Sequence, residues 1–274
     1  MIGTRLRALT AHPALLGGAA VLILLLLWAT VLPLPFDPRL PDAAQTLRAP
    51  SGEHWFGTDQ NGVDVFSRLV AAARNDIPLA FGGALLAGIV GVPIGLALSR
   101  QGRWQNLCMR LLDLMQSLPM IVVALTIVAL AGRGAGKMLV ALAIINVVSF
   151  IRLARSEALT VRTLRFVDAV RAMGAPEPWI LARHVLPNVL PVVFAELSLS
   201  SGQSLLTIAG LGFLGVGVQP TTPSWGLMLN SGTQFISSGQ WWVFVYPIVA
   251  IVVTVLSFNA VARGLSRLID RTER

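Results

Sequence analysis

Long windows of this chain carry almost no charge, and they restrict the folds that it can adopt. Between His184 and Ala262 the only formally charged side chain is Glu196. Soluble domains carry about 25% charged residues, whereas this chain has 12% and is 55% hydrophobic. Backbone polar groups in a lipid hydrocarbon region must be satisfied within the protein, as they are in helices. The sequence therefore predicts an all-α integral membrane protein.

About six transmembrane helices are expected, because a crossing needs about 20 apolar residues. The fourth window is short, so we expect that helix to continue past Arg152, with its flanking cations reaching the interface. The first window lacks a following small-x-small cleavage site, which favours a retained span over a signal peptide. The expected spans are approximately Ala14–Leu32, Ile77–Ser99, Leu107–Ala131, Met138–Leu153, Val189–Val216 and Trp241–Ala262.

The arginines predict the orientation. With the N-terminus inside, fifteen arginines fall in inner segments and six lysines or arginines fall in outer ones. Inner loops are the positively charged ones, so both termini and the charged loop 154–187 are expected in the cytoplasm. Of the two longer outer segments, Gln219–Gln240 is expected to form a re-entrant or surface turn. Its tryptophans and those just after it are expected to anchor at the interface, namely Trp225, Trp241 and Trp242.

Residues 166–187 form a charged segment between membrane-grade windows. Helical spacing of its apolar residues predicts a short helix that Gly174 ends in the left-handed conformation. Pro176, Pro178 and Glu177 favour a second short helix, running to about Val185. Two helices across a glycine make a compact knob suited to a groove on a soluble partner. The alternative is a solvated basic loop near anionic lipid.

This spacing resembles the cytoplasmic coupling loop of permease subunits of binding-protein-dependent ABC importers. The family pattern is Glu-Ala-Ala, three residues, Gly, then nine residues to Ile-x-Leu-Pro. Asp168 and Val170 depart from it conservatively. The resemblance implies a type I importer permease fold in which loop 155–187 docks on an ATPase. The implied docking residues are Asp168, Ala169, Val170, Arg171, Gly174, Ala175, Trp179, Leu186 and Pro187.

Three further segments are similar to signatures of the dipeptide, oligopeptide and nickel branch, and to the second of its two paired permeases. They imply an N-terminal span with an outer loop over residues 1–74 and a core permease domain over residues 75–274. Departures at Val63, Ile208 and Ala262-Arg263 leave the cargo open between a peptide and nickel or a metal chelate, and we expect a peptide. The segments are His54–Arg68, Phe213–Gly226 and Trp241–Asn259.

The resemblance also implies the partners: a second permease, two ATP-binding cassette subunits, an extracytoplasmic binding protein and the lipid of the bacterial inner membrane. ATP and Mg²⁺ are expected on the ATPases, with no cofactor, metal or catalytic residue in this chain. Two glycine-rich segments, Gly210–Gly215 and Gly132–Lys137, lack the context of nucleotide-binding loops. No nucleic acid is expected, because the arginines flank apolar runs and form no basic stripe.

Two acids lie near or within the membrane. Asp113 is expected to form a structural pair with its neighbour Arg110, with a role in transport as the alternative. Glu196 is an intramembrane acid and therefore a candidate for the transport pathway, with interhelical hydrogen bonding as the alternative; the pathway candidates are Glu196, Ser200 and Gln203. A rival of another class, an ion-coupled transporter, needs broken helices in paired repeats around such groups.

Overall fold

The computed structural model describes residues 13–31, 33–100, 102–219 and 221–272. Leu32, the end of the first expected span, and Pro220, inside the segment Phe213–Gly226, lie outside these ranges, as do Arg5, Arg7 and Arg274, which were counted in the orientation argument. The described residues form helices and loops, with one isolated β-bridge between Thr58 and Asp64. The helical elements are α2 (Pro13–Val31), η1 (Ala43–Gln45), α3 (Val65–Ala97), α4 (Arg103–Gln116), α5 (Met120–Ala131), α6 (Ala135–Arg162), α7 (Arg165–Ala172), α8 (Glu177–Ile180), η2 (Leu181–Val185), α9 (Leu186–Phe213), α10 (Trp225–Gly232), η3 (Thr233–Phe235) and α11 (Trp242–Thr272).

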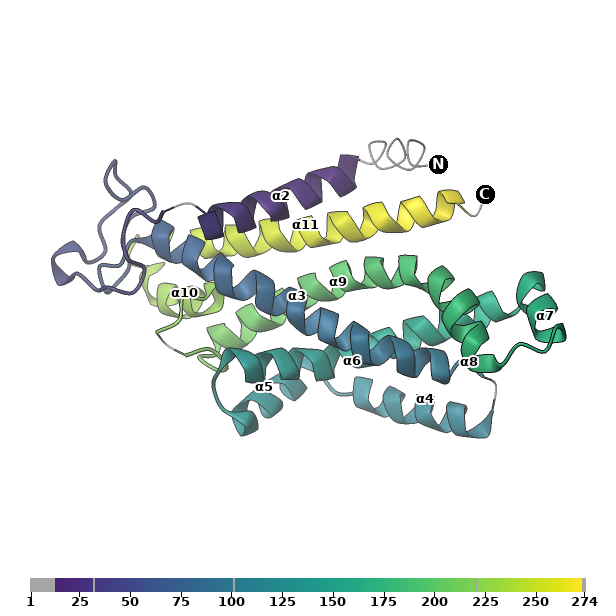
Figure 1. The fold of residues 1–274 in the computed structure, drawn as a ribbon. Coiled ribbons are helices and arrows are strands. Elements are labelled where there is room, and N and C mark those ends of the chain that lie inside the picture. The colour runs from purple at the N-terminus through teal and green to yellow at the C-terminus, as the bar shows by residue number, and fades with distance from the viewer. Residues whose placement is uncertain (1–12, 32, 101, 220, 273–274) are drawn as a thin grey trace.

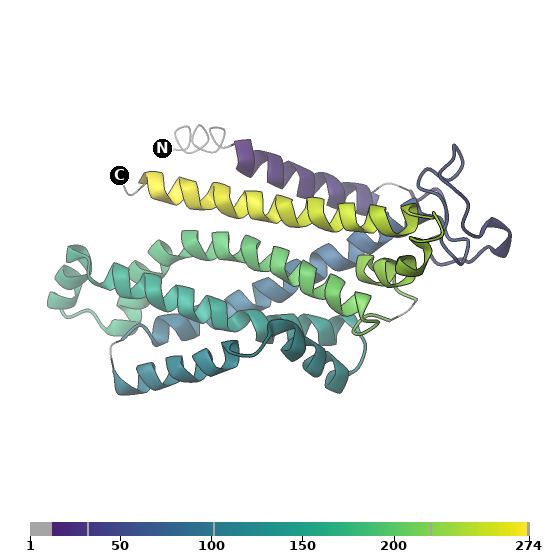
Figure 2. The same ribbon diagram turned by 180° about the vertical axis from the view of Figure 1, so that it is seen from behind.

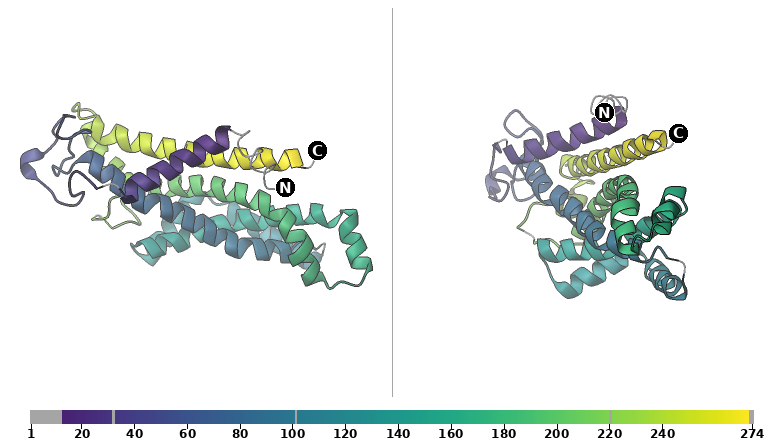
Figure 3. Two further views of the ribbon diagram at one scale, coloured as in Figure 1. Left: turned by 45° about the horizontal axis from the view of Figure 1, so that its top comes forward. Right: turned by 45° about the vertical axis from the view of Figure 1, so that its right-hand side comes forward.

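The long helices run side by side in an elongated bundle. Helices α2 and α11 form one side, α3, α6 and α9 form the middle, and α4 with α5 lies along the opposite side (Figures 1 and 2). A loop-rich end, called the outer end after the orientation that the arginines predict, holds residues 36–64 and α10, while α7 and α8 project from the other end (Figure 3). The start of α2 and the end of α11 lie toward the end that carries α7, as the predicted even number of crossings requires.

Small residues bring the central pair, α3 and α6, close together. A Cβ atom added at Gly83 would lie 2.6 Å from the Cβ atom of Leu142, and one at Gly91 would lie 2.7 Å from that of Phe150. Small side chains let helix backbones approach closely where the lipid supplies no hydrophobic driving force between helices. The closely packed helices α3 and α6 form the centre of the bundle.

The third expected span is not a single straight helix. Five described helices are long and apolar enough to cross a membrane, and α4 and α5 make a sixth crossing only as a pair bent by 85°. The break falls at Ser117–Pro119, where Pro119 has no N–H to continue the ladder of α4. The span expected over Leu107–Ala131 is therefore this bent pair of helices, with Pro119 at the break.

The fourth and fifth spans are longer than their apolar windows. Helix α6 has 28 residues, about 42 Å at 1.5 Å per residue, so the prediction that it continues past Arg152 is confirmed. The second short helix, expected to run to about Val185, passes into the next span by a change of helix type and not by a break. The π turn η2 forms the junction, with the Leu186 N–H donating to the carbonyl of Leu181, and α9 follows directly.

Two of the three tryptophans expected at the interface lie in the core. Trp225 is 1% exposed and its indole N–H donates to the Leu69 carbonyl at 3.0 Å. Trp242 is likewise buried and donates to the Thr58 carbonyl at 3.2 Å. The prediction that they anchor at the interface is wrong, because a carbonyl of α3 and a loop carbonyl satisfy the two indoles inside the protein. Trp241, the third of these tryptophans, remains about half exposed.

Candidate functional site

The coupling knob, defined as residues 165–185, consists of α7, α8 and η2. Helix α7 ends at Ala172, and Gly174 follows with a φ of +83°. Its N–H donates to the Arg171 carbonyl at 3.0 Å, so the predicted left-handed ending at Gly174 is confirmed. The chain then turns into α8 at Glu177. Two short helices across a glycine, as expected, give the knob its compact shape.

An ion-pair network braces the knob against α6. Glu177 accepts from Arg162 at 2.5 Å and from Arg171 at 3.1 Å, while Arg171 also donates to Asp168 at 2.8 Å. Partial burial raises the pKa of Glu177, but the two guanidiniums outweigh it and hold the pKa below its usual range. The sequence singled out Asp168 and Arg171 but missed the role of Arg162, whose only signal was its place at the end of the long fourth helix.

The inner side of the knob is packed and its tip is exposed. Val167, Ile180 and Val185 are fully buried in a cluster that includes Phe150 of α6. In contrast, Met173 at the tip is 77% exposed. Of the residues predicted to dock, Val170, Ala175 and Leu186 are half-buried, and the others are exposed: Asp168, Ala169, Arg171, Gly174, Trp179 and Pro187. The knob thus presents a firmly held, partly apolar surface.

The second predicted group lies in α9, within the membrane-spanning part. The Glu196 carboxylate accepts from the Ser200 hydroxyl at 3.0 Å, so the structure brings these two together. Gln203 lies further along α9 and is exposed. Glu196 also lines a cavity of about 570 Å³ between α9 and α11, together with Arg263 and Arg267. No pattern in the sequence indicated that these arginines share a cavity with Glu196, because they lie on a different helix.

Asp113 does not form the expected pair. Its carboxylate pairs with Arg152 of α6 and not with Arg110 on its own helix. Asn106 also accepts from a residue of α6, Arg155, at 3.1 Å. The prediction was wrong because it considered only the local neighbour, whereas the polar face of α4 is turned toward the arginines of α6.

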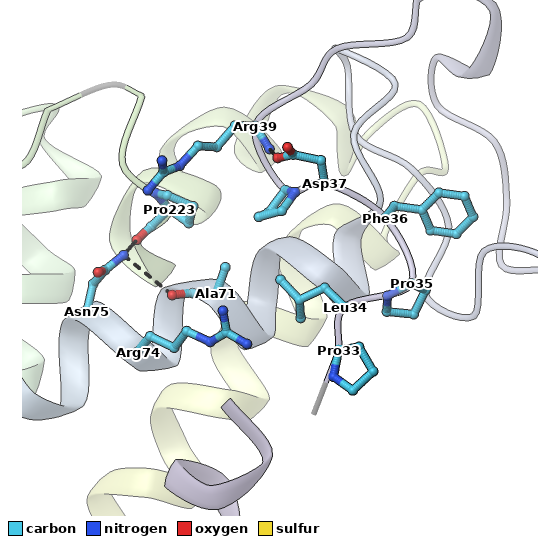
Figure 4. A pocket seen from close by; sticks show the side chains of 11 residues that line it. Pro33, Leu34, Pro35, Phe36, Asp37, Arg39, Ala71, Arg74, Asn75 and Pro223 are labelled. Atoms are coloured by element: carbon cyan, nitrogen blue, oxygen red, sulfur yellow. Dashed lines mark hydrogen bonds between the residues drawn. The ribbon is translucent and has the colours of Figure 1, made fainter. Parts of the chain in front are cut away.

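The outer end holds acidic groups that the sequence did not single out. Asp76 of α3 accepts from the Ser224 hydroxyl at 3.1 Å and from the Trp225 N–H at 2.8 Å. Next to it, Asn75 donates to the Pro223 carbonyl at 2.9 Å, beside a hollow of about 570 Å³ (Figure 4). The available signal was an acid inside an otherwise apolar helix.

A family comparison identifies what this arrangement belongs to. Residues 87–274 match the family described as "binding-protein-dependent transport system inner membrane component". The chain belongs to this family. It is therefore a multi-pass membrane permease component of an ABC importer, a transport subunit and not itself an enzyme.

Curated relatives of this permease carry transport names. It is 40% identical over 225 residues to the dipeptide transport system permease protein DppC of Alkalihalophilus pseudofirmus, covering 82% of this chain and 74% of the relative. It is 33% identical to the probable D,D-dipeptide transport system permease protein DdpC of Escherichia coli K12, covering 96% and 89%. It is 34% identical to the glutathione transport system permease protein GsiD of Pectobacterium atrosepticum, covering 96% and 88%.

A solved structure supports the fold. An inward-facing structure of the MetNI methionine ABC transporter matches with a TM-score of 0.62 at 19% identity, covering 76% of this chain and 98% of the matched chain. At this identity the match shows the type I permease architecture alone. Together with the family match it confirms the predicted fold class.

Proposed function

We propose that this permease imports di- and oligopeptides across the bacterial inner membrane as one half of a heteromeric pore. Its partners would be a second, homologous permease, two ATP-binding cassette subunits and an extracytoplasmic binding protein, within the surrounding lipid. Both termini and the coupling knob would lie in the cytoplasm. The observation that carries the proposal is the braced knob with its exposed, partly apolar tip. The dipeptide and glutathione names of the relatives support a peptide cargo over nickel.

The knob would act as a lever and perform no chemistry. ATP and Mg²⁺ would be held by the ATPases, whose closure would displace the knob as a rigid body. Two connections transmit that motion: the ion pair from Glu177 to Arg162 at the end of α6, and the unbroken passage from η2 into α9. Glu196, Ser200 and Gln203 would then change their exposure to the pathway, because α9 carries all three.

The test is uptake by proteoliposomes that contain the chain with its co-purified partners, supplied with binding protein and ATP. We expect ATP-dependent accumulation of a labelled dipeptide that a non-hydrolysable analogue abolishes. Uptake driven by a proton gradient without ATP would refute the proposal and favour an ion-coupled transporter. Uptake of nickel in place of the peptide would refute the cargo and leave the machinery intact.

A further inference from the structure

Helices α6, α9 and α11 line one face of the molecule that carries polar groups at membrane depth. Figure 2 shows the ribbons of these helices. On α9, Glu196, Leu199 and Gln203 follow one another at helical spacing, and Leu199 and Gln203 are exposed in the single chain. Ionisable side chains within a membrane face a bundle interior or a water-filled cavity. This face is therefore expected to be covered by protein or water in the assembled permease, and not by lipid tails.

The cavity on this face has the size of a small-molecule site. Its volume of about 570 Å³ lies within the usual range of roughly 300–1,000 Å³. Its walls include Leu199 of α9 and Leu256 of α11, and its polar groups are Glu196, Asn259, Ser266 and the two arginines of α11. Apolar walls with a few convergent polar groups are the usual composition of a ligand site.

The depth of the arginines places this cavity toward the inner side. Arg263 follows Trp242, the first residue of α11, by 21 positions, which is about 32 Å of helix. The hydrocarbon core is about 30 Å thick, so Arg263 lies near its inner boundary and Arg267 lies one turn beyond. Asn259, which shares the cavity with Glu196, lies one turn before Arg263. The charges are therefore spread along the direction of transport.

The charged groups of the cavity do not neutralise one another. Among the described residues, no ion pair joins Glu196 to Arg263 or Arg267, and the hydrogen-bond partner of the Glu196 side chain is the neutral Ser200. The side chains of both arginines are exposed to the cavity side of α11. One carboxylate and two guanidiniums are thus available to a ligand that carries both signs of charge.

We propose that this cavity binds the two charged ends of an imported peptide before its release. Glu196 would accept the α-ammonium group, and Arg263 with Arg267 would hold the α-carboxylate, for which a guanidinium has a matching bidentate geometry. The inference rests on the proposed peptide cargo. A phospholipid phosphate would also suit the arginines but would be repelled by Glu196, so a peptide zwitterion fits the full set of charges better.

The test measures uptake of three forms of one dipeptide by the complete reconstituted transporter: uncapped, N-acetylated and C-amidated. Each variant is expressed relative to wild type for the same peptide, so preferences of the binding protein cancel. Glu196→Gln is expected to lower uptake of the uncapped and amidated forms about tenfold and to spare the acetylated form. The double change Arg263→Gln with Arg267→Gln is expected to lower uptake of the uncapped and acetylated forms and to spare the amidated form.

Two matched controls remove charge without touching the cavity. Glu157→Gln on α6 and Arg103→Gln at the start of α4 are expected to leave all three ratios near one. If the binding protein rejects a capped peptide, uptake of that peptide is uninformative. Its equilibrium binding to the detergent-purified complex is then measured without binding protein.

The possible outcomes distinguish failure of the proposed site from failure of the proposed peptide cargo. Equal losses for all three peptides, or no loss, would overturn the site while leaving peptide import established. A loss in the arginine variant that followed the anionic lipid content of the vesicles, whatever the peptide cap, would assign the arginines to lipid and overturn the site. If wild type transported no form and bound none, the proposed cargo and the site would both fail.

Discussion

The two ends of the molecule are held together in different ways. At the outer end, buried polar pairs fix loop to helix: His54 with Asp64 at 2.9 Å, and Asp76 with Ser224 and Trp225. At the opposite end, the ion pairs of the knob are partly exposed, and Met173 at the tip is 77% exposed. The pairs at the outer end are buried within this chain, whereas the knob is held by ion pairs to α6 and its tip is exposed.

This difference predicts which substitutions should lower the stability of the chain and which should impair its coupling to ATP hydrolysis. A buried acceptor that is removed leaves its donors unsatisfied, which costs more than the loss of an exposed pair. Substitutions at the outer end should therefore destabilise the chain itself. Substitutions on the knob should leave the chain folded and impair its work with the ATPases.

The largest expected effect on stability is at Asp76. Asp76→Leu leaves the Ser224 hydroxyl and the Trp225 N–H without an acceptor, at about 1–3 kcal/mol for each group. We expect the unfolding temperature in detergent to fall by roughly 10 °C. Glu53→Leu, a change of an exposed acid at the same end, should move it by at most about 2 °C. An unchanged unfolding temperature for Asp76→Leu would remove the contrast between the two ends.

The largest expected effect on coupling is at Gly174. Its surroundings are open, but a β-branched residue at a φ of +83° is strained by about 1–2 kcal/mol. Gly174→Val should therefore distort the knob, raising the ATP hydrolysed per peptide imported at least tenfold while the complex still assembles. Gly174→Asn, which tolerates this conformation, should stay near the wild-type ratio. Normal uptake by the valine variant would count against the lever.

A smaller effect is expected at Glu177, whose two ion pairs are worth about 1 kcal/mol together because they are partly exposed. Glu177→Gln should lower uptake roughly threefold at neutral pH with little change in unfolding temperature. The pKa of Glu177 is lowered in the folded chain, so its contribution is complete above the ordinary pKa and disappears as pH falls through the lowered value. ATP-driven uptake by the wild type should therefore not change with pH between about pH 6 and 8 through this group. If wild-type uptake declines across that window, Glu177 is excluded as the cause.

The smallest effect on the isolated chain is expected at Met173. Because this side chain is 77% exposed, Met173→Ala should change the free energy of unfolding by at most about 0.5 kcal/mol. If the tip docks on an ATPase, the same change should weaken retention of that subunit during purification several-fold. Retention indistinguishable from wild type would mean that the tip is not part of the interface.

How much could be predicted depended on whether the cause was local in sequence. The spans and the glycine turn of the knob follow from hydrophobicity and from the freedom of Gly174, which are local properties. The break at Pro119 was also local, but the apolar run around it concealed its effect. The partners of Asp113 and Trp225 and the arginines beside Glu196 come from other helices, and one sequence without covariation does not indicate which helices meet.

Docking of the knob on an ATPase is tested most directly by site-specific cross-linking in native membranes. Cys108 is the single cysteine, so Cys108→Ser gives a background for Met173→Cys. The matched control is Trp104→Cys, which is similarly exposed (76%) but lies on α4 outside the knob. We expect Met173→Cys to form a cross-linked product with an ATP-binding subunit, in a yield that changes when ATP is added, and Trp104→Cys to form little product. Equal yields of product from both positions, or no product from Met173→Cys in an active transporter, would contradict docking of the knob on an ATPase.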